Sequence, residues 1–153
     1  MNQSLLLPFC WLAICATCFG TVRESREASC TRDTLGNLRL AFERYYTEYA
    51  TVPTGDTRAV MAALTGNSTD GQNPRKIVFF EFRAPRARSH FWSDDAVPGD
   101  RGSDGLPIDG WGRSVILTLD PATMQATFRS LGRNGRDDAG HPDDVVFTYT
   151  PKG

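Results

Sequence analysis

The stretch that most constrains the fold of this chain is residues 107–147. It begins with a tight Asp-Gly-Trp-Gly corner at residues 109–112. Two runs with alternating apolar and polar residues follow, at 114–120 and 124–130. The residues between them, Asp120-Pro121-Ala122-Thr123, are typical of a short hairpin turn. The pattern therefore predicts a β-hairpin that directly follows a sharp corner.

The segment after this hairpin, residues 131–144, is rich in Gly, Asn and Asp and carries almost no apolar side chains. Structureless loops longer than about 12–15 residues are uncommon in compact domains unless function fixes them. Oxygen-bearing side chains at this density are the ligands that hard cations such as calcium use. We therefore expect the functional site of the chain in this loop.

Length and charge limit the other possibilities. A chain of 153 residues corresponds to one domain, because domains hold about 100–200 residues. Its 17 basic and 18 acidic residues give a net charge of −1, which argues against general binding of nucleic acid. Only Cys30 lies outside the apolar N-terminal run, so a disulfide does not staple the domain.

The N-terminal run, residues 5–20, is uncharged. It is shorter than the roughly 20 residues that a helix needs to cross a bilayer, and it resembles the apolar part of a signal peptide. We expect residues 1–30 to be a signal peptide or membrane anchor and residues 31–153 to form an exported globular domain. A buried N-terminus is the alternative.

Residues 34–50 predict an amphipathic helix, because Leu35, Leu38, Phe42, Tyr45 and Tyr49 recur at helical spacing. The helix can run back along the chain and join the apolar segment. A second, shorter helix is expected over residues 58–64, capped by the residues at 56 or 57. The β-branched and aromatic residues at 76–82 predict a strand or a strand-like core segment.

Taken in order, these features resemble the C-terminal domain of the major pseudopilin of type II secretion systems, in the type IV pilin-like group. The resemblance covers residues 35–147 and is carried by two motifs, Pro-x-Asp-x-Trp-Gly at 107–112 and Ser-Leu-Gly-x-Asn-Gly at 130–135. It implies an α+β fold in which a long N-terminal helix packs on a small antiparallel sheet. The structural corner in this resemblance is Asp109, Trp111 and Gly112.

The resemblance also implies a calcium ion in the loop after the hairpin. By position, the Leu131 carbonyl and the Asn134 side chain match the start of that site. Asp144 matches its closing carboxylate. The remaining candidate ligands for the middle of the site are Asp137, Asp138 and Asp143. Asn134 stands where the family usually has Asp, which removes one negative charge and should weaken affinity. An acidic loop without an ion is the alternative.

The expected function is a non-enzymatic, exported structural protein of the type II secretion pseudopilus. Its expected partners are other pseudopilin or secretion-system subunits or further copies of this chain, and nucleic acid is not expected. The expected location is the periplasm, anchored at the inner membrane through residues 5–20, or the cell surface.

One departure from the family leaves a second function open. The cleavage motif of the family, a Gly before a hydrophobic stretch with an early Glu, is absent at residues 20–27, and the segment 21–37 is polar. A stand-alone binding module that does not polymerise is therefore the alternative. A metal-assisted hydrolase using His90 and His141 is disfavoured, since no motif brings these residues into a catalytic arrangement. We expect Trp111 to pack in the core, with an exposed partner contact as the alternative.

Overall fold

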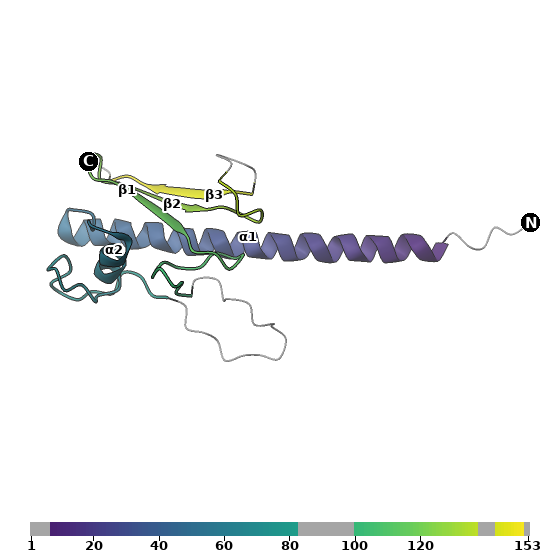
Figure 1. Ribbon diagram of the computed structural model, residues 1–153, viewed down its shortest axis with the longest axis horizontal. Helices are drawn as coiled ribbons and strands as arrows, with labels where there is room; N and C mark the ends of the chain where they lie inside the picture. Colours follow the sequence, from purple (N-terminus) through teal and green to yellow (C-terminus); the bar gives the residue numbers. More distant parts are fainter. Residues whose placement is uncertain (1–6, 83–99, 138–142, 152–153) are drawn as a thin grey trace, which may run out of the picture.

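The computed structural model describes residues 7–82, 100–137 and 143–151, with side chains from residue 26 onward. The fold is α+β and pilin-like: one long helix packs against a small antiparallel sheet. The helices are α1 (Leu7–Tyr49) and α2 (Thr57–Leu64), and the strands are β1 (Ile116–Asp120), β2 (Gln125–Ser130) and β3 (Val145–Tyr149). Figure 1 shows α1 running along the sheet and continuing well beyond it toward the N-terminus.

Helix α1 joins the apolar and amphipathic segments of the sequence into one element, as expected. Its 43 residues correspond to a length of roughly 65 Å at 1.5 Å per residue. The helix ends where Ala50 adopts a left-handed conformation, with φ of 54°. The Ala50 N–H donates to the Tyr46 carbonyl oxygen at 2.7 Å and so closes the last turn.

The sheet is an antiparallel meander in the order β1-β2-β3. The predicted hairpin is confirmed as β1 and β2, which pair from Ile116↔Arg129 to Asp120↔Gln125. Asp120 shapes the turn between them, because its carboxylate accepts hydrogen bonds from the Ala122 N–H at 3.0 Å and the Thr123 hydroxyl at 2.7 Å.

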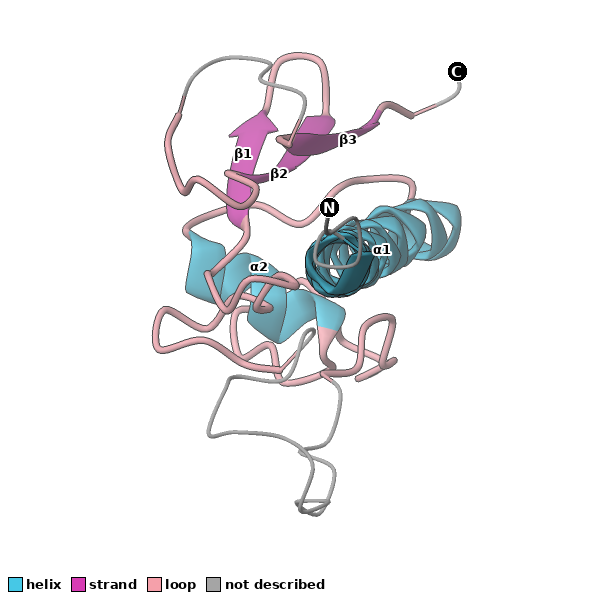
Figure 2. Ribbon diagram, turned by 90° about the vertical axis from the view of Figure 1, so that its right-hand side faces the viewer, coloured by secondary structure: helices cyan, strands magenta, loops and turns pink. Residues whose placement is uncertain are grey.

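The two helices lie on one side of the sheet, with α1 beneath β3 and α2 toward β1 (Figure 2). Phe42 of α1 is fully buried between this helix and the sheet. The centroid of its ring lies 5.1 Å from that of Phe128 of β2 and 6.1 Å from that of Tyr149 of β3. Alternation along the strands sends Val145, Phe147 and Tyr149 toward the helix, as a two-residue period requires. The core buries Leu35, Leu38, Ala41, Phe42, Tyr45, Val60, Met61, Ala63, Leu64, Val115, Ala126 and Phe128.

Helix α2 confirms the predicted second helix. Asp56 is its N-cap, since its carboxylate accepts the Ala59 N–H at 2.8 Å. The helix is closed by Thr65 and by Gly66, whose φ of 76° suits glycine.

The segment 76–82 is not a strand; it is an extended core segment that pairs with no strand in the described part of the chain. The Phe79 and Phe80 N–H groups instead both donate to the Leu64 carbonyl at the end of α2, at 2.8 and 3.0 Å. Asn73, almost fully buried, anchors the segment through Ile77: its amide donates to the Ile77 carbonyl and its oxygen accepts the Ile77 N–H. The third strand is β3, which the sequence analysis did not predict.

Candidate functional site

The Asp-Gly-Trp-Gly corner is organised by Asp109, whose side chain is completely buried. One of its oxygens accepts the Trp111 and Arg113 N–H groups, each at 2.9 Å. The other accepts the hydroxyl of Ser130, the last residue of β2, at 2.6 Å. Three hydrogen bonds offset the cost of burying this polar side chain and join the corner to the end of the hairpin.

The corner also contacts α1. The Gly110 N–H donates to the Thr31 hydroxyl at 2.9 Å, and that hydroxyl donates to the Glu27 carbonyl oxygen at 2.9 Å. Any side chain at Gly110 would collide with the Glu27 backbone, because a Cβ there would lie 2.7 Å from the Glu27 carbonyl carbon. Glycine at position 110 therefore allows the corner to approach the helix closely.

Trp111 lies at the margin of the core rather than in its centre. The residue is half-buried and is not part of the central hydrophobic cluster. Its indole nitrogen is buried and donates to no acceptor in the described part of the chain. Our expectation that the ring fills the space between sheet and helix is therefore wrong in detail, because Phe42, Phe128 and Tyr149 fill that space.

The first part of the loop after β2 is held by Arg113, the residue that follows the corner. Its guanidinium donates to the Gly132 carbonyl at 2.5 Å and to the Arg133 carbonyl at 3.0 Å. Gly135, with φ of 65°, leaves room for this group, since a Cβ there would lie 2.8 Å from the Arg113 Nε. A side-chain cation thus binds two main-chain carbonyls of the loop.

The two ends of the loop meet at Asn134 and Asp143. The Asn134 N–H donates to the Asp143 carboxylate at 3.1 Å, and Gly132, with φ of 59°, packs directly against the Asp143 backbone. The Leu131 carbonyl accepts the Gly135 N–H at 3.1 Å, and the Asn134 side-chain oxygen accepts the Arg136 N–H at 2.7 Å. The backbone of Asn134 is therefore joined to the Asp143 carboxylate, while the Leu131 carbonyl and the Asn134 side-chain oxygen each accept a hydrogen bond within the loop.

The other expected ligands are placed differently. Asp137 forms an ion pair with Arg129 of β2, with two N–O distances of 2.5 and 2.7 Å. This hydrogen bonding raises the pKa of the Arg129 guanidinium, and the charges of Asp137 and Asp144 add to the effect. Asp144 is half-buried beside β3. Asp138 lies outside the described residues, so its expected role stays a prediction.

Arginine side chains supply positive charge to this acidic loop, and the sequence analysis did not assign them a role. Arg113 binds the carbonyls at its start and Arg129 binds Asp137. Among the described residues, no group of three or more His, Cys, Asp or Glu side chains is placed to hold a metal. The oxygens of Leu131, Asn134 and Asp143 are nevertheless carbonyl and carboxylate donors, the kind that a hard cation prefers.

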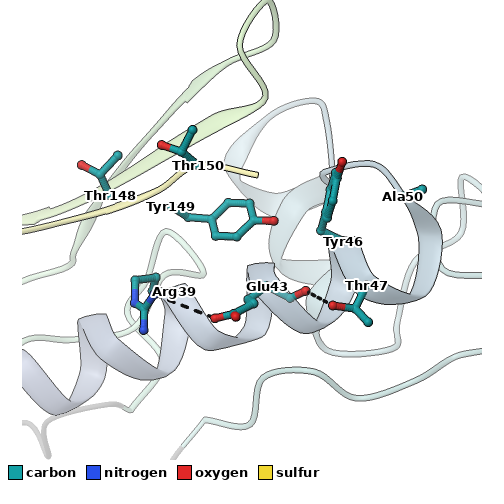
Figure 3. Close-up of a pocket in the computed structure, with 8 residues that line it drawn as sticks. All are labelled: Arg39, Glu43, Tyr46, Thr47, Ala50, Thr148, Tyr149 and Thr150. Carbon is teal, nitrogen blue, oxygen red and sulfur yellow. Dashed lines mark hydrogen bonds and ion pairs between the residues drawn. The ribbon is translucent and has the colours of Figure 1, made fainter. Parts of the chain in front are cut away.

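A second candidate site is a groove between α1 and β3, which we call the β3 groove (Figure 3). Its volume is about 610 Å³, within the range of small-molecule and peptide side-chain pockets. Figure 3 shows Tyr149 extending from β3 toward Tyr46 of α1, and the centroids of the two rings are 6.4 Å apart. The groove is lined by Arg39, Glu43, Tyr46, Thr47, Ala50, Thr148, Tyr149 and Thr150.

The β3 groove is electrically balanced. Arg39 and Glu43 form an exposed ion pair of 3.8 Å along α1. Burial raises the pKa of the Tyr149 phenol, and the neighbouring Tyr46 and Glu43 raise it further. Tyr149 is therefore neutral at ordinary pH, and the one positive and one negative side chain of the groove lie side by side.

The histidines of the disfavoured hydrolase, His90 and His141, lie outside the described residues. No described helix carries a stretch long and apolar enough to cross a membrane. Comparison with models of known protein families finds no match, and comparisons with curated proteins and with solved structures find none either.

Proposed function

We propose that this chain is an exported, pilin-like structural protein in which α1 carries a globular head. The observation that carries the proposal is the continuity of α1 from Leu7 to Tyr49. The head packs on the C-terminal part of this helix, where the buried positions run from Thr31 to Tyr45. The remainder projects away from the head and ends in the apolar sequence at residues 5–20 (Figure 1).

In this arrangement the projecting part of α1 attaches the protein, and the head remains free of that role. A helix that extends beyond its domain exposes a surface that the domain does not cover, and an apolar sequence on it must find another covering. A membrane interface or the helices of neighbouring subunits would provide one. In the type II secretion pseudopilus, the proposed setting, those neighbours would be other pseudopilins or copies of this chain. The role is structural and requires no reaction.

The proposal includes a calcium site at the junction of the loop ends. Leu131, Asn134 and Asp143 would supply oxygens to the ion, and Asp144 follows directly in sequence. Calcium would supply positive charge between these donors and hold the start of β3 against the end of β2.

The alternative, a stand-alone binding module of the same fold, is favoured by charges on α1 near the place where the helix leaves the head. Arg32 and Asp33 are both exposed there. Burying such charges between packed helices would be costly unless each found a partner. A filament would have to pair them across subunits, whereas a stand-alone module would leave them in water.

The test is to express the full chain in a bacterium and to fractionate the cells. We expect the chain in the membrane fraction, released by detergent but not by high salt. The double variant Leu12→Arg/Ile14→Arg should move it to the soluble fraction, because charge in the apolar segment opposes insertion. Ser29→Arg, at an exposed position of the same helix, is the matched control and should not.

Electron microscopy and chemical cross-linking of the membrane fraction then separate the two functions. A ladder of cross-linked species, lost in the double variant, supports the structural subunit. A membrane-bound monomer supports the stand-alone module. A full chain that stays soluble and unexported contradicts both.

A further inference from the structure

Within the described residues, the outer edge of β3 has neither a charged residue nor a proline to protect it. Among the described residues β3 pairs only with β2, so its other edge is free. Its sequence, Val-Val-Phe-Thr-Tyr, contains no charge and no proline, and Val146 is 52% exposed. Edge strands normally avoid unwanted pairing with charged residues, proline, bulges or a cover. An unprotected edge of high β-propensity is a template for another strand.

The β3 groove lies along this same edge. A strand paired with β3 would cross the α1 surface that lines the groove, with every second side chain directed toward the helix. Those side chains would contact the partly exposed Tyr46 and the exposed Thr47, whereas Tyr149 is only 6% exposed and adds little to this surface. Hydrogen bonds to the backbone of β3 would give the added strand its affinity, and contacts in the groove would select which peptide sequences bind.

We propose that β3 and the β3 groove bind an extended peptide segment of a partner protein as a fourth strand of the sheet. The segment is uncharged on the side that faces α1, because Arg39 and Glu43 already pair with each other in the groove and Tyr46 forms an aromatic wall beside them. Apolar or aromatic residues at alternate positions suit this wall.

The choice of a partner segment over a second copy of the chain rests on the proposed function. Two copies joined by the same strand edge are related by a two-fold axis, which makes the paired strands antiparallel. Since α1 runs along β3, the two long helices would then point in opposite directions (Figure 1). Subunits attached to one membrane or packed in one filament need parallel helices, so this pairing does not fit.

The probe is a display library of eight-residue peptides, selected on the full chain held in detergent micelles. We expect selected peptides to alternate apolar residues and to lose affinity about tenfold or more against Thr47→Arg, which places a long charged side chain in the groove. Asn37→Arg, at an exposed α1 position outside the groove, should bind them normally. Peptide N-methylation should abolish binding at one set of alternate amides and be tolerated at the other. Bound peptide should slow amide exchange in β3 but not in β1.

Three results would overturn the inference: peptides whose binding ignores Thr47→Arg, peptides that tolerate both patterns of methylation, or a dimer in sedimentation that Thr47→Arg dissociates. The last would assign the edge to a second copy. Peptide binding does not depend on membrane attachment. If peptides do not bind but the chain is found in the membrane fraction, only this inference is refuted. If peptides bind but the chain is not found in the membrane fraction, only the proposed function is refuted.

Discussion

At the scale of single residues, Asp109 is the group on which the candidate site depends. It is fully buried, and the three hydrogen bonds it accepts come from two parts of the site: the Trp111 and Arg113 backbone at the corner and the Ser130 hydroxyl at the end of β2. Ser130 in turn accepts the Gly132 N–H at 3.2 Å, so the chain of hydrogen bonds reaches the loop. Removing this carboxylate would leave several buried donors without an acceptor.

We predict that Asp109→Ala lowers the free energy of unfolding by about 3–4 kcal/mol, because unsatisfied buried groups cost roughly 1–3 kcal/mol each. Asp109→Asn should cost less, about 1–2 kcal/mol, since its amide oxygen can still accept both backbone N–H groups and its NH₂ can donate to Ser130. Urea denaturation measures both. Asp33→Ala, at an exposed site on α1, is the control and should change stability by less than about 0.5 kcal/mol. Equal effects of Asp109→Ala and Asp33→Ala would contradict the role given to Asp109.

At the scale of elements, the sequence predicts those whose signals are local. Both helices and the β1–β2 hairpin follow from apolar spacing, the Asp56 cap and the Asp120 turn. The segments 76–82 and 145–149 are equally rich in β-branched and aromatic residues, yet only the second is a strand. The two segments differ in their hydrogen-bond partners. β3 pairs with the edge of β2 that β1 leaves open, whereas the Phe79 and Phe80 N–H groups donate to the Leu64 carbonyl at the end of α2. Propensity alone does not report which segment has a partner.

The same limit applies to the candidate site. The candidate ligands Leu131 and Asn134 could be proposed from the motif at residues 130–135, whereas Asp143 was one of three candidates that the motif does not distinguish. The role of Arg113 could not be proposed in this way, since its contacts with the Gly132 and Arg133 carbonyls join residues about 20 positions apart across the hairpin. The β3 groove was equally hidden, because it forms only when β3, absent from the sequence prediction, lies beside α1.

The calcium site is tested on the loop between β2 and β3. We expect millimolar calcium, compared with EDTA, to raise the melting temperature by several degrees, since an ion at 100 times its dissociation constant adds about 2.7 kcal/mol. Asp143→Ala should abolish the rise, whereas Asp33→Ala should keep it and magnesium should not reproduce it. If calcium leaves the melt unchanged, the loop is ordered without an ion by its own hydrogen bonds and by Arg113 and Arg129, and the calcium part of the proposal fails while the fold stands.

At the scale of the whole molecule, α1 has two parts: one that packs in the head and one that projects from it. The head begins to contact it at Glu27 and Thr31, through the corner at Gly110. The expected domain boundary at residue 30 therefore falls inside a continuous helix, and the contacts of the head begin slightly before it. Residues 7–25 lie on the part of α1 that projects from the head (Figure 1).

This division predicts how the chain responds to truncation. Deleting residues 1–25 should leave the melting temperature of the head within about 2 °C, because changes away from packed features cost less than roughly 0.5 kcal/mol. Deleting residues 1–34 removes the Thr31 hydroxyl that holds the Gly110 N–H, together with the buried Thr34, and frays the helix into the core position Leu35. That deletion should lower the melting temperature by about 6 °C or more, at 2–4 °C for each kcal/mol in a domain of this size. Calorimetry of both truncated forms measures this difference. If both deletions lowered the melting temperature equally, the projecting part of α1 would stabilise the head. The idea that this part serves only for attachment would then have to be abandoned.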